Sequence, residues 1–142
     1  MASKKTPAKK SGIIHASGKR KRAMARATIR PGHGLVRINR KDIRIMEPEL
    51  ARLRLQEPLI IAGDLAKQID VDVHVIGGGW SGQVEAARLA IGKALAQFGG
   101  EDLKKTLLDY DRHLLVADTR YKEPRKFGRH SRARAKRQKS YR

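Results

Sequence analysis

The chain has 142 residues, no cysteine and a formal net charge of +19 at pH 7. This length predicts one domain, with or without tails, and a chain without cysteine has neither disulfides nor thiolate metal ligands. No apolar run approaches the roughly 18 residues of a membrane span, and the N-terminus lacks a signal-peptide apolar region, so we expect a cytoplasmic protein without a membrane partner.

The positive charge is concentrated at the two ends of the chain. Residues 1–30 hold ten Lys or Arg and no acid, residues 120–142 hold eleven bases and one acid, and the twelve bases between them face thirteen acids. We predict a disordered basic arm over residues 1–12, a globular domain over 13–119 and an extended basic tail over 120–142. Nucleic acid is the expected partner of such a chain. A membrane surface is the weaker alternative, because the arms lack a bulky apolar face.

Two strands with a cationic face are predicted after the N-terminal arm. Residues 22–30 alternate small or branched apolar side chains with Arg or Thr, and residues 35–40 repeat the pattern after a Pro-Gly turn. These arginines would face water in the simplest interpretation. Their repetition on two adjacent strands, beside the basic run 19–22, favours phosphate contacts. Ile43 and Ile45 predict a short third strand.

The middle of the chain predicts helices. Glu47-Pro48-Glu49 is typical of a helix start, and Pro58 is expected to end or redirect that helix. Residues 59–69 fit a strand or a helix, and we interpret residues 64–67 as a short helical piece.

Residues 71–98 predict a strand, a glycine hinge and a helix in unbroken order. Valines alternate with polar residues over 71–75, and apolar residues then recur every three or four positions from Val84 to Phe98. The structural hinge between them is formed by Gly77, Gly78, Gly79 and Gly82.

A second helix is predicted over residues 101–110, after the break at Gly99-Gly100, and residues 113–117 are expected to return to the sheet. Gly92 lies inside the earlier helix, where glycine costs about 1 kcal/mol relative to alanine. We therefore expect backbone to pack closely against it, and sheet backbone rather than RNA. Periodicity alone predicts an α+β fold.

The hinge also fits the dinucleotide pattern GxGxxG at Gly77, Gly79 and Gly82. That fold needs a second parallel strand with an acidic ribose ligand about 20 residues on. In this chain the acidic residues at that spacing are Glu101 and Asp102, which lie between two predicted helices and not at the end of a strand. The Gly-Lys-Ser/Thr sequence of a phosphate-binding loop does not follow the glycines either. Nucleotide binding is therefore not predicted, and we expect no cofactor.

The hinge and its helix carry a more specific pattern, GGGWSGQVEAARLAIGKAL at residues 77–95. This resembles the signature of the family of small-subunit ribosomal protein nine. The resemblance continues in GKRKRAMARATIRPGHG at 18–34, LVRINR at 35–40 and DTR at 118–120, and so covers nearly the whole chain. The ending QKSYR at 138–142 is similar to the archaeal and eukaryotic-cytosolic branch, and we expect an archaeal member.

The resemblance implies a compact two-layer α+β domain with a roughly four-stranded mixed sheet and helices on one face, similar to the second domain of small-subunit ribosomal protein five. It implies a structural, non-enzymatic constituent of cytoplasmic ribosomes that binds the 3′ major domain of ribosomal RNA in the small-subunit head. Neighbouring ribosomal proteins are implied partners. The C-terminal tail is implied to reach the anticodon stem-loop of peptidyl-site tRNA.

The expected RNA-binding residues are the bases of the two arms and of the cationic strands, because each phosphate contact releases counterions and arginine binds phosphate bidentately. For ribosomal RNA they are Lys19, Arg20, Lys21, Arg22, Arg26, Arg30, Arg37, Arg40, Arg120, Lys122, Arg125, Lys126, Arg129, Arg132, Arg134, Lys136 and Arg137. The expected tRNA contacts are Lys139, Tyr141 and Arg142. Bacterial members end in Lys-Arg, so we expect Tyr141 to stack instead. A generic solubilising or nuclear-targeting tail is the alternative.

No catalytic or metal site is predicted. The histidines lack metal-ligand spacing, Ser81 lacks the final glycine of a nucleophile elbow, and we interpret Asp109 and Asp111 as solvated acids at a helix end. Two alternative functions remain. One is a basic subunit of an RNA-cleaving enzyme, by fold analogy with the protein of ribonuclease P, and the other is a DNA-compacting protein.

Overall fold

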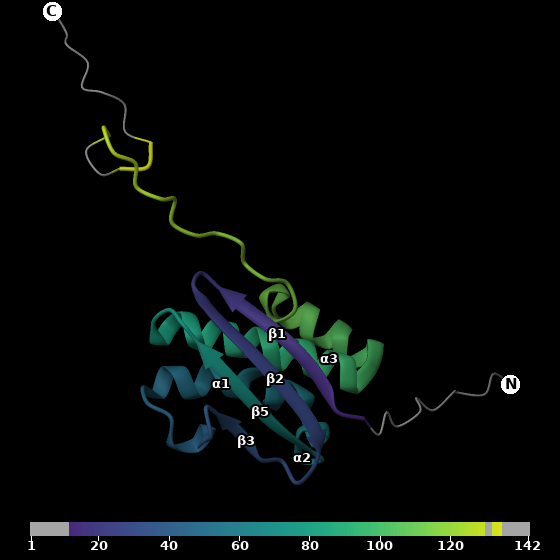
Figure 1. The fold of residues 1–142 in the computed structure, drawn as a ribbon. Helices are drawn as coiled ribbons and strands as arrows, with labels where there is room; N and C mark the ends of the chain where they lie inside the picture. The colour runs from purple at the N-terminus through teal and green to yellow at the C-terminus, as the bar shows by residue number, and fades with distance from the viewer. Residues whose placement is uncertain (1–11, 130–131, 135–142) are drawn as a thin grey trace, which may run out of the picture.

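The computed structural model describes residues 12–129 and 132–134. One mixed sheet of five strands runs through this part of the chain in the order β1-β2-β5-β3-β4 (Figure 1). Strand β3 is parallel to β5, and the other neighbours are antiparallel. The strands are β1 (Ile14–Arg20), β2 (Ala23–Pro31), β3 (Val36–Ile38), β4 (Lys41–Asp42) and β5 (Ile69–Ile76).

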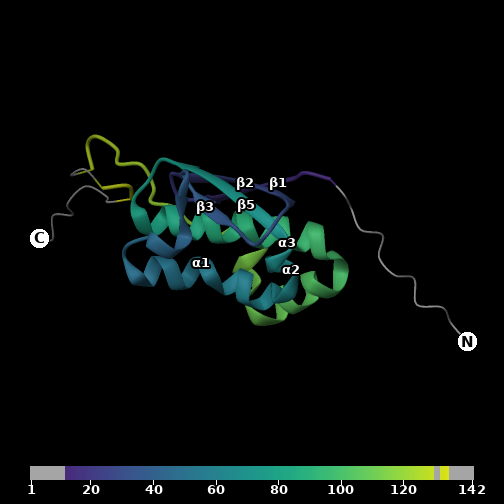
Figure 2. The same cartoon turned by 90° about the horizontal axis from the view of Figure 1, so that it is seen from below.

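The helices lie together on one face of the sheet, as Figure 2 shows. They are α1 (Glu49–Ala62), α2 (Asp64–Lys67) and α3 (Trp80–Tyr110), with single 3₁₀ turns η1 (Ile43–Ile45) and η2 (Arg112–Leu114). Helix α3 is kinked at Gly100, whose φ of 79° and ψ of −165° are not helical. The prediction of two helical pieces that meet at Gly99-Gly100 is therefore confirmed, as is the short piece at 64–67.

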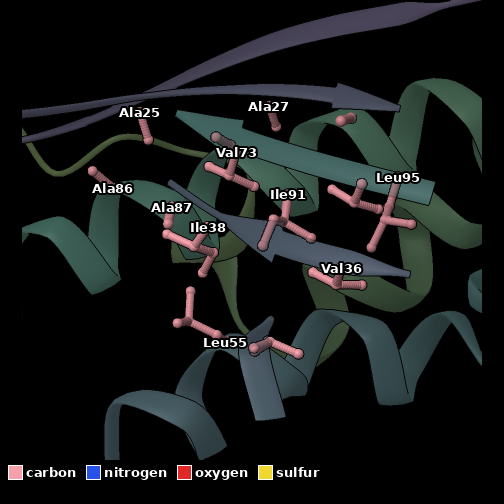
Figure 3. Packing of buried hydrophobic residues seen from close by; sticks show 14 of the residues in the cluster. Ala25, Ala27, Val36, Ile38, Leu55, Val73, Ala86, Ala87, Ile91 and Leu95 are labelled. Atoms are coloured by element: carbon pink, nitrogen blue, oxygen red, sulfur yellow. The ribbon is translucent and has the colours of Figure 1, made fainter. Parts of the chain in front are cut away.

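Every second side chain of β2 and β5 is buried, which is the reason that their two-residue period was visible in the sequence. The core between the two layers is aliphatic (Figure 3). Val73 of β5 and Ile38 of β3 lie on the side of the sheet that faces Ile91 and Leu95 of α3, and Leu55 of α1 lies below them in Figure 3. Burial of each such side chain contributes about 1.5 to 3 kcal/mol.

Strand β1 lies directly on α3 because glycine leaves room for helix backbone. A Cβ atom at Gly18 would lie 2.2 Å from the carbonyl oxygen of Ala86 and 2.8 Å from the backbone nitrogen of Ala90. The sheet has five strands where the resemblance implied roughly four, and no strand was predicted over residues 14–20. The inward positions of β1, Ile14, Ala16 and Gly18, are mostly too small to show a strand period.

Residues 113–117 do not return to the sheet, contrary to the prediction. Asp111 accepts a hydrogen bond from the N–H of His113 at 2.8 Å, so the chain turns into η2 and buries Leu114 completely. The carbonyl oxygen of Leu114 lies 2.5 Å from the place where a Cβ at Gly92 would be. The expected close backbone partner of Gly92 is therefore this turn and not the sheet.

Two further local predictions are wrong. Residues Ile43 and Ile45 belong to η1, because Asp42 caps the turn by accepting a hydrogen bond from the N–H of Arg44 at 2.8 Å. Pro58 does not end α1 but lies inside it. Proline removes one helical hydrogen bond, but Pro58 is one of the buried residues of α1, together with Leu55 and Ala62.

Candidate RNA-binding surface

The face of the sheet opposite the helices carries basic side chains. Arg26 and Arg30 of β2 and Arg37 of β3 are exposed there, and Lys19 of β1 lies opposite Met24 at the end of the same face. Asp72 is the exposed acid among them, directly opposite Arg37 in the register of β3 and β5. This face matches the two cationic strand faces expected from the sequence.

Asp70, the other acid on the outer side of β5, is used to hold a loop. Its carboxylate accepts hydrogen bonds from the N–H groups of His33 at 2.9 Å and Leu35 at 3.0 Å. The hydrogen bond from Leu35, followed by that from His33, lowers the pKa of Asp70 below its usual value. Its charge therefore stabilises the turn between β2 and β3.

A groove lies beside this face, between three segments distant in sequence. Its walls are the β1–β2 turn, the start of α3 with its glycine hinge, and residues 117–125. Nine Lys or Arg line it against four acids, so basic groups are in excess. These bases are Lys19, Arg20, Lys21, Arg22, Arg54, Arg88, Arg120, Lys122 and Arg125.

All four acids of the groove are engaged by arginine. Glu85 pairs with Arg54 at 2.5 Å and Asp111 with Arg88 at 2.9 Å, while Glu123 pairs with Arg134. The fourth, Asp118, pairs with Arg20 and Arg120. Within the described part of the chain, Lys21, Arg22 and Lys122 make no ion pair, so their charges remain available to an anionic ligand.

Asp118 fixes the point at which the C-terminal segment leaves the domain. Its carboxylate pairs with Arg20 of β1 at 3.0 Å and with the Arg120 side chain at 2.8 Å, and it accepts the N–H of Arg120 at 2.9 Å. Arg20 also donates to the carbonyl oxygen of Arg120 at 3.1 Å. The hydrogen bond from the Arg120 side chain holds the pKa of Asp118 well below its usual range. We call this set of contacts the Asp118 clamp.

Arg88 plays a structural part that its place on the helix did not suggest. It is 7% exposed, although the sequence places it off the apolar stripe of α3. Its guanidinium pairs with Glu57 of α1 at 2.5 Å and with Asp111 at 2.9 Å. Burial raises the pKa of Asp111, but hydrogen bonds from the His113 N–H and from Arg88 outweigh it, so the pKa lies below its usual value. Asp111 is thus not the solvated acid that was predicted.

The structure brings the predicted RNA-binding residues together in two groups and leaves others apart. Around the groove lie Lys19, Arg20, Lys21, Arg22, Arg120, Lys122 and Arg125. On the open sheet face lie Arg26, Arg30 and Arg37, and Arg40 is exposed in the turn between β3 and β4. Farther along the C-terminal segment, Lys126, Arg129, Arg132 and Arg134 are exposed. Outside the described residues lie Lys136, Arg137, Lys139, Tyr141 and Arg142.

The predicted glycine hinge connects β5 to α3 and contacts the β1–β2 turn. Gly77 and Gly78 have φ of 73° and 68°, which favour glycine. A Cβ at Gly77 would lie 2.6 Å from the carbonyl oxygen of Arg22. The absence of a side chain at Gly77 therefore allows the β1–β2 turn to pack closely against the hinge. Sequence reasoning missed Trp80, which follows the hinge, lines the groove and is 56% exposed. Its position before the apolar stripe of α3 was the available signal.

The part of the chain that the structure describes contains neither a candidate metal site nor a candidate membrane-spanning helix. No group of three or more His, Cys, Asp or Glu is placed to hold a metal ion over residues 12–129 and 132–134. No helix in the same residues has the length and apolar character needed to cross a membrane.

The fold and this surface define a class, a small α+β domain that presents basic side chains from its sheet and chain ends, as RNA-binding proteins do. Residues 18–142 match the family model described as Ribosomal protein S9/S16. The chain belongs to this family.

Its relatives include archaeal ribosomal proteins, which agrees with the prediction that the chain is an archaeal member of the family. Small ribosomal subunit protein uS9 of Methanococcus maripaludis strain S2 is 50% identical over 132 residues, which are 92% of this chain and 98% of that protein. The protein of the same name from Methanococcus vannielii is 50% identical with the same coverage, and that of Methanococcus maripaludis strain C5 is 49% identical. Membership of a ribosomal protein family confirms the prediction that the chain is not an enzyme. It favours the ribosomal hypothesis over RNA processing and DNA compaction.

Proposed function

We propose that this chain is a structural component of the small ribosomal subunit in the cytoplasm, where it binds ribosomal RNA. The observation that carries the proposal is the excess of bases on the open sheet face and in the adjoining groove, where nine bases face four acids that are already paired with arginine. Such an excess of positive charge attracts a polyanion. Because the relatives are small ribosomal subunit proteins, we infer that this polyanion is ribosomal RNA.

Binding uses both groups of bases. The residues around the groove and those on the open sheet face grip the 3′ major domain of the RNA in the subunit head, beside neighbouring ribosomal proteins. The exposed bases of the C-terminal segment continue the contact. Lys139, Tyr141 and Arg142, which lie outside the described residues, touch the anticodon stem-loop of peptidyl-site tRNA.

The test compares two variants of the full chain that each lose three positive charges. The first, R26Q/R30Q/R37Q, changes the open sheet face, and the control, K67Q/K104Q/K105Q, changes exposed lysines on the helical side. Affinity for protein-free small-subunit ribosomal RNA is measured across a salt series, and co-sedimentation with small-subunit particles gives the stoichiometry. Each lost phosphate contact lowers the dependence of log K on log salt by about 0.7 to 0.9.

We expect the sheet-face variant to lose about 2 to 3 from that slope, and the control to keep the slope of the unchanged chain. One copy of the unchanged chain should sediment with each particle. Binding that is indifferent to salt, or equal losses in the two variants, would contradict the proposal.

A further inference from the structure

The groove holds an aromatic side chain that the fold does not use. Trp80 is the first residue of α3, lines the groove and is 56% exposed. It is the only tryptophan of the chain. An exposed indole gains little from the core of its own domain, but it offers a large rigid face to a ligand.

The surroundings of Trp80 are basic rather than apolar. The β1–β2 turn that faces it carries Lys21 and Arg22, both exposed and without an ion pair among the described residues. The acid nearest in sequence, Glu85, is held by Arg54 at 2.5 Å. Tyr121, which is 73% exposed, lines the same groove from the C-terminal segment.

We propose that this groove is a binding site for an unpaired nucleotide of RNA, whose base stacks on Trp80 while its phosphates meet Lys21 and Arg22. The inference rests on the proposed function and adds to it the kind of RNA element that is bound. Bases within an A-form helix stack on one another, so only a loop, bulge or strand end can offer a base face to an aromatic side chain.

A nucleotide fits this groove better than an apolar segment of a neighbouring protein. A protein segment that buried Trp80 would also bury Lys21 and Arg22, and buried charges are costly unless they are paired. A nucleotide brings the compensating charge with it, because its phosphates accompany the base. Stacking on aromatic side chains beside a cationic backbone track is the usual mode of single-strand recognition.

The test uses the fluorescence of Trp80 in the full chain. The probes are an oligouridylate, an RNA duplex of equal nucleotide number and protein-free small-subunit ribosomal RNA, each with binding followed separately by the anisotropy of a dye on the RNA. We expect Trp80 emission to be quenched when the oligouridylate or the ribosomal RNA binds, and to stay nearly unchanged when the duplex binds.

Tyr110 provides the matched control, because it is a 60% exposed aromatic residue that ends α3 and does not itself line the groove, although its neighbour Asp111 does. The W80F/Y110W variant moves the only tryptophan there, and its emission should not respond to RNA. Loss of one stacked base corresponds to about 1 to 3 kcal/mol, so W80A should bind the oligouridylate about 5- to 150-fold more weakly, and Y110A should bind it like the unchanged chain.

Unchanged Trp80 emission with RNA bound would overturn this inference and leave the proposed function standing. An emission change that appears only after other small-subunit proteins are added would overturn it in favour of a protein contact. Failure to bind any of the three RNAs would overturn the proposed function, and this inference with it.

Discussion

Gly92 of α3 allows the backbone of η2 to pack closely against the helix, because glycine has no side chain there. In its place, alanine would direct a Cβ to within 2.5 Å of the Leu114 carbonyl oxygen, which is backbone and cannot move alone. We expect G92A to destabilise the chain by about 1 to 3 kcal/mol from overpacking, although alanine is the better helix former by about 1 kcal/mol. Urea unfolding of the full chain measures the difference.

Gly12 is the control for that substitution, because a Cβ there meets nothing within 4 Å. G12A should therefore unfold like the unchanged chain. If G92A proved as stable as G12A, the close contact with η2 would be wrong.

Single residues also mark the limit of what the sequence could predict. The cost of a glycine inside a helix indicated a close neighbour at Gly92, but it could not say which segment supplied it. The sequence likewise predicted that arginines would form the site, without distinguishing those that bind other residues. Arg88 and Arg20 are held by acids, and their partners Glu57, Asp111 and Asp118 lie far away in the chain. Such pairing depends on the folded topology, which no local pattern contains.

At the scale of elements, Arg88 joins three of them. It belongs to α3 and pairs with Glu57 of α1 and with Asp111, which caps η2. R88M fills similar space but leaves two partly buried carboxylates without their cation. Removal of one partner from a buried ion pair costs about 3 kcal/mol or more, so we expect R88M to lose about that much stability in urea unfolding.

A triple variant separates lost pairing from lost packing. If stranded charge causes the defect, R88M/E57Q/D111N should regain a clear part of the stability lost in R88M, because neutral amides are less costly to bury. A triple variant less stable than R88M would show that packing dominates at this position.

The elements that the sequence predicted are those with one continuously buried face. The valines of β5 and the apolar stripe of α3 both face the core, so their periods were visible. The missed strand β1 and the segment 113–117 owe their positions to close backbone contacts at Gly18 and Gly92. Hydrophobic periodicity predicts which side chains are buried, but it gives no signal where backbone packs against backbone.

At the scale of the whole molecule, the proposed roles of the domain and the tail should be separable. Deletion of residues 138–142 removes the proposed tRNA contacts and keeps every core residue of the described part of the chain. We expect particles reconstituted with the shortened chain to assemble their head normally but to retain peptidyl-site tRNA less well, as filter binding would measure. Failed assembly, with tRNA affinity unchanged in rescued particles, would contradict this division.

The Asp118 clamp joins residues that are 100 positions apart, Arg20 and Arg120, and β1 rests on a helix that begins at Trp80. A growing polypeptide therefore exposes the β1–β2 hairpin early and covers its inner face later, because α3 and the Asp118 clamp are translated after it. Contacts between such distant positions form slowly. During that interval we expect the bases of the hairpin to be open to polyanions before the rest of the domain has formed.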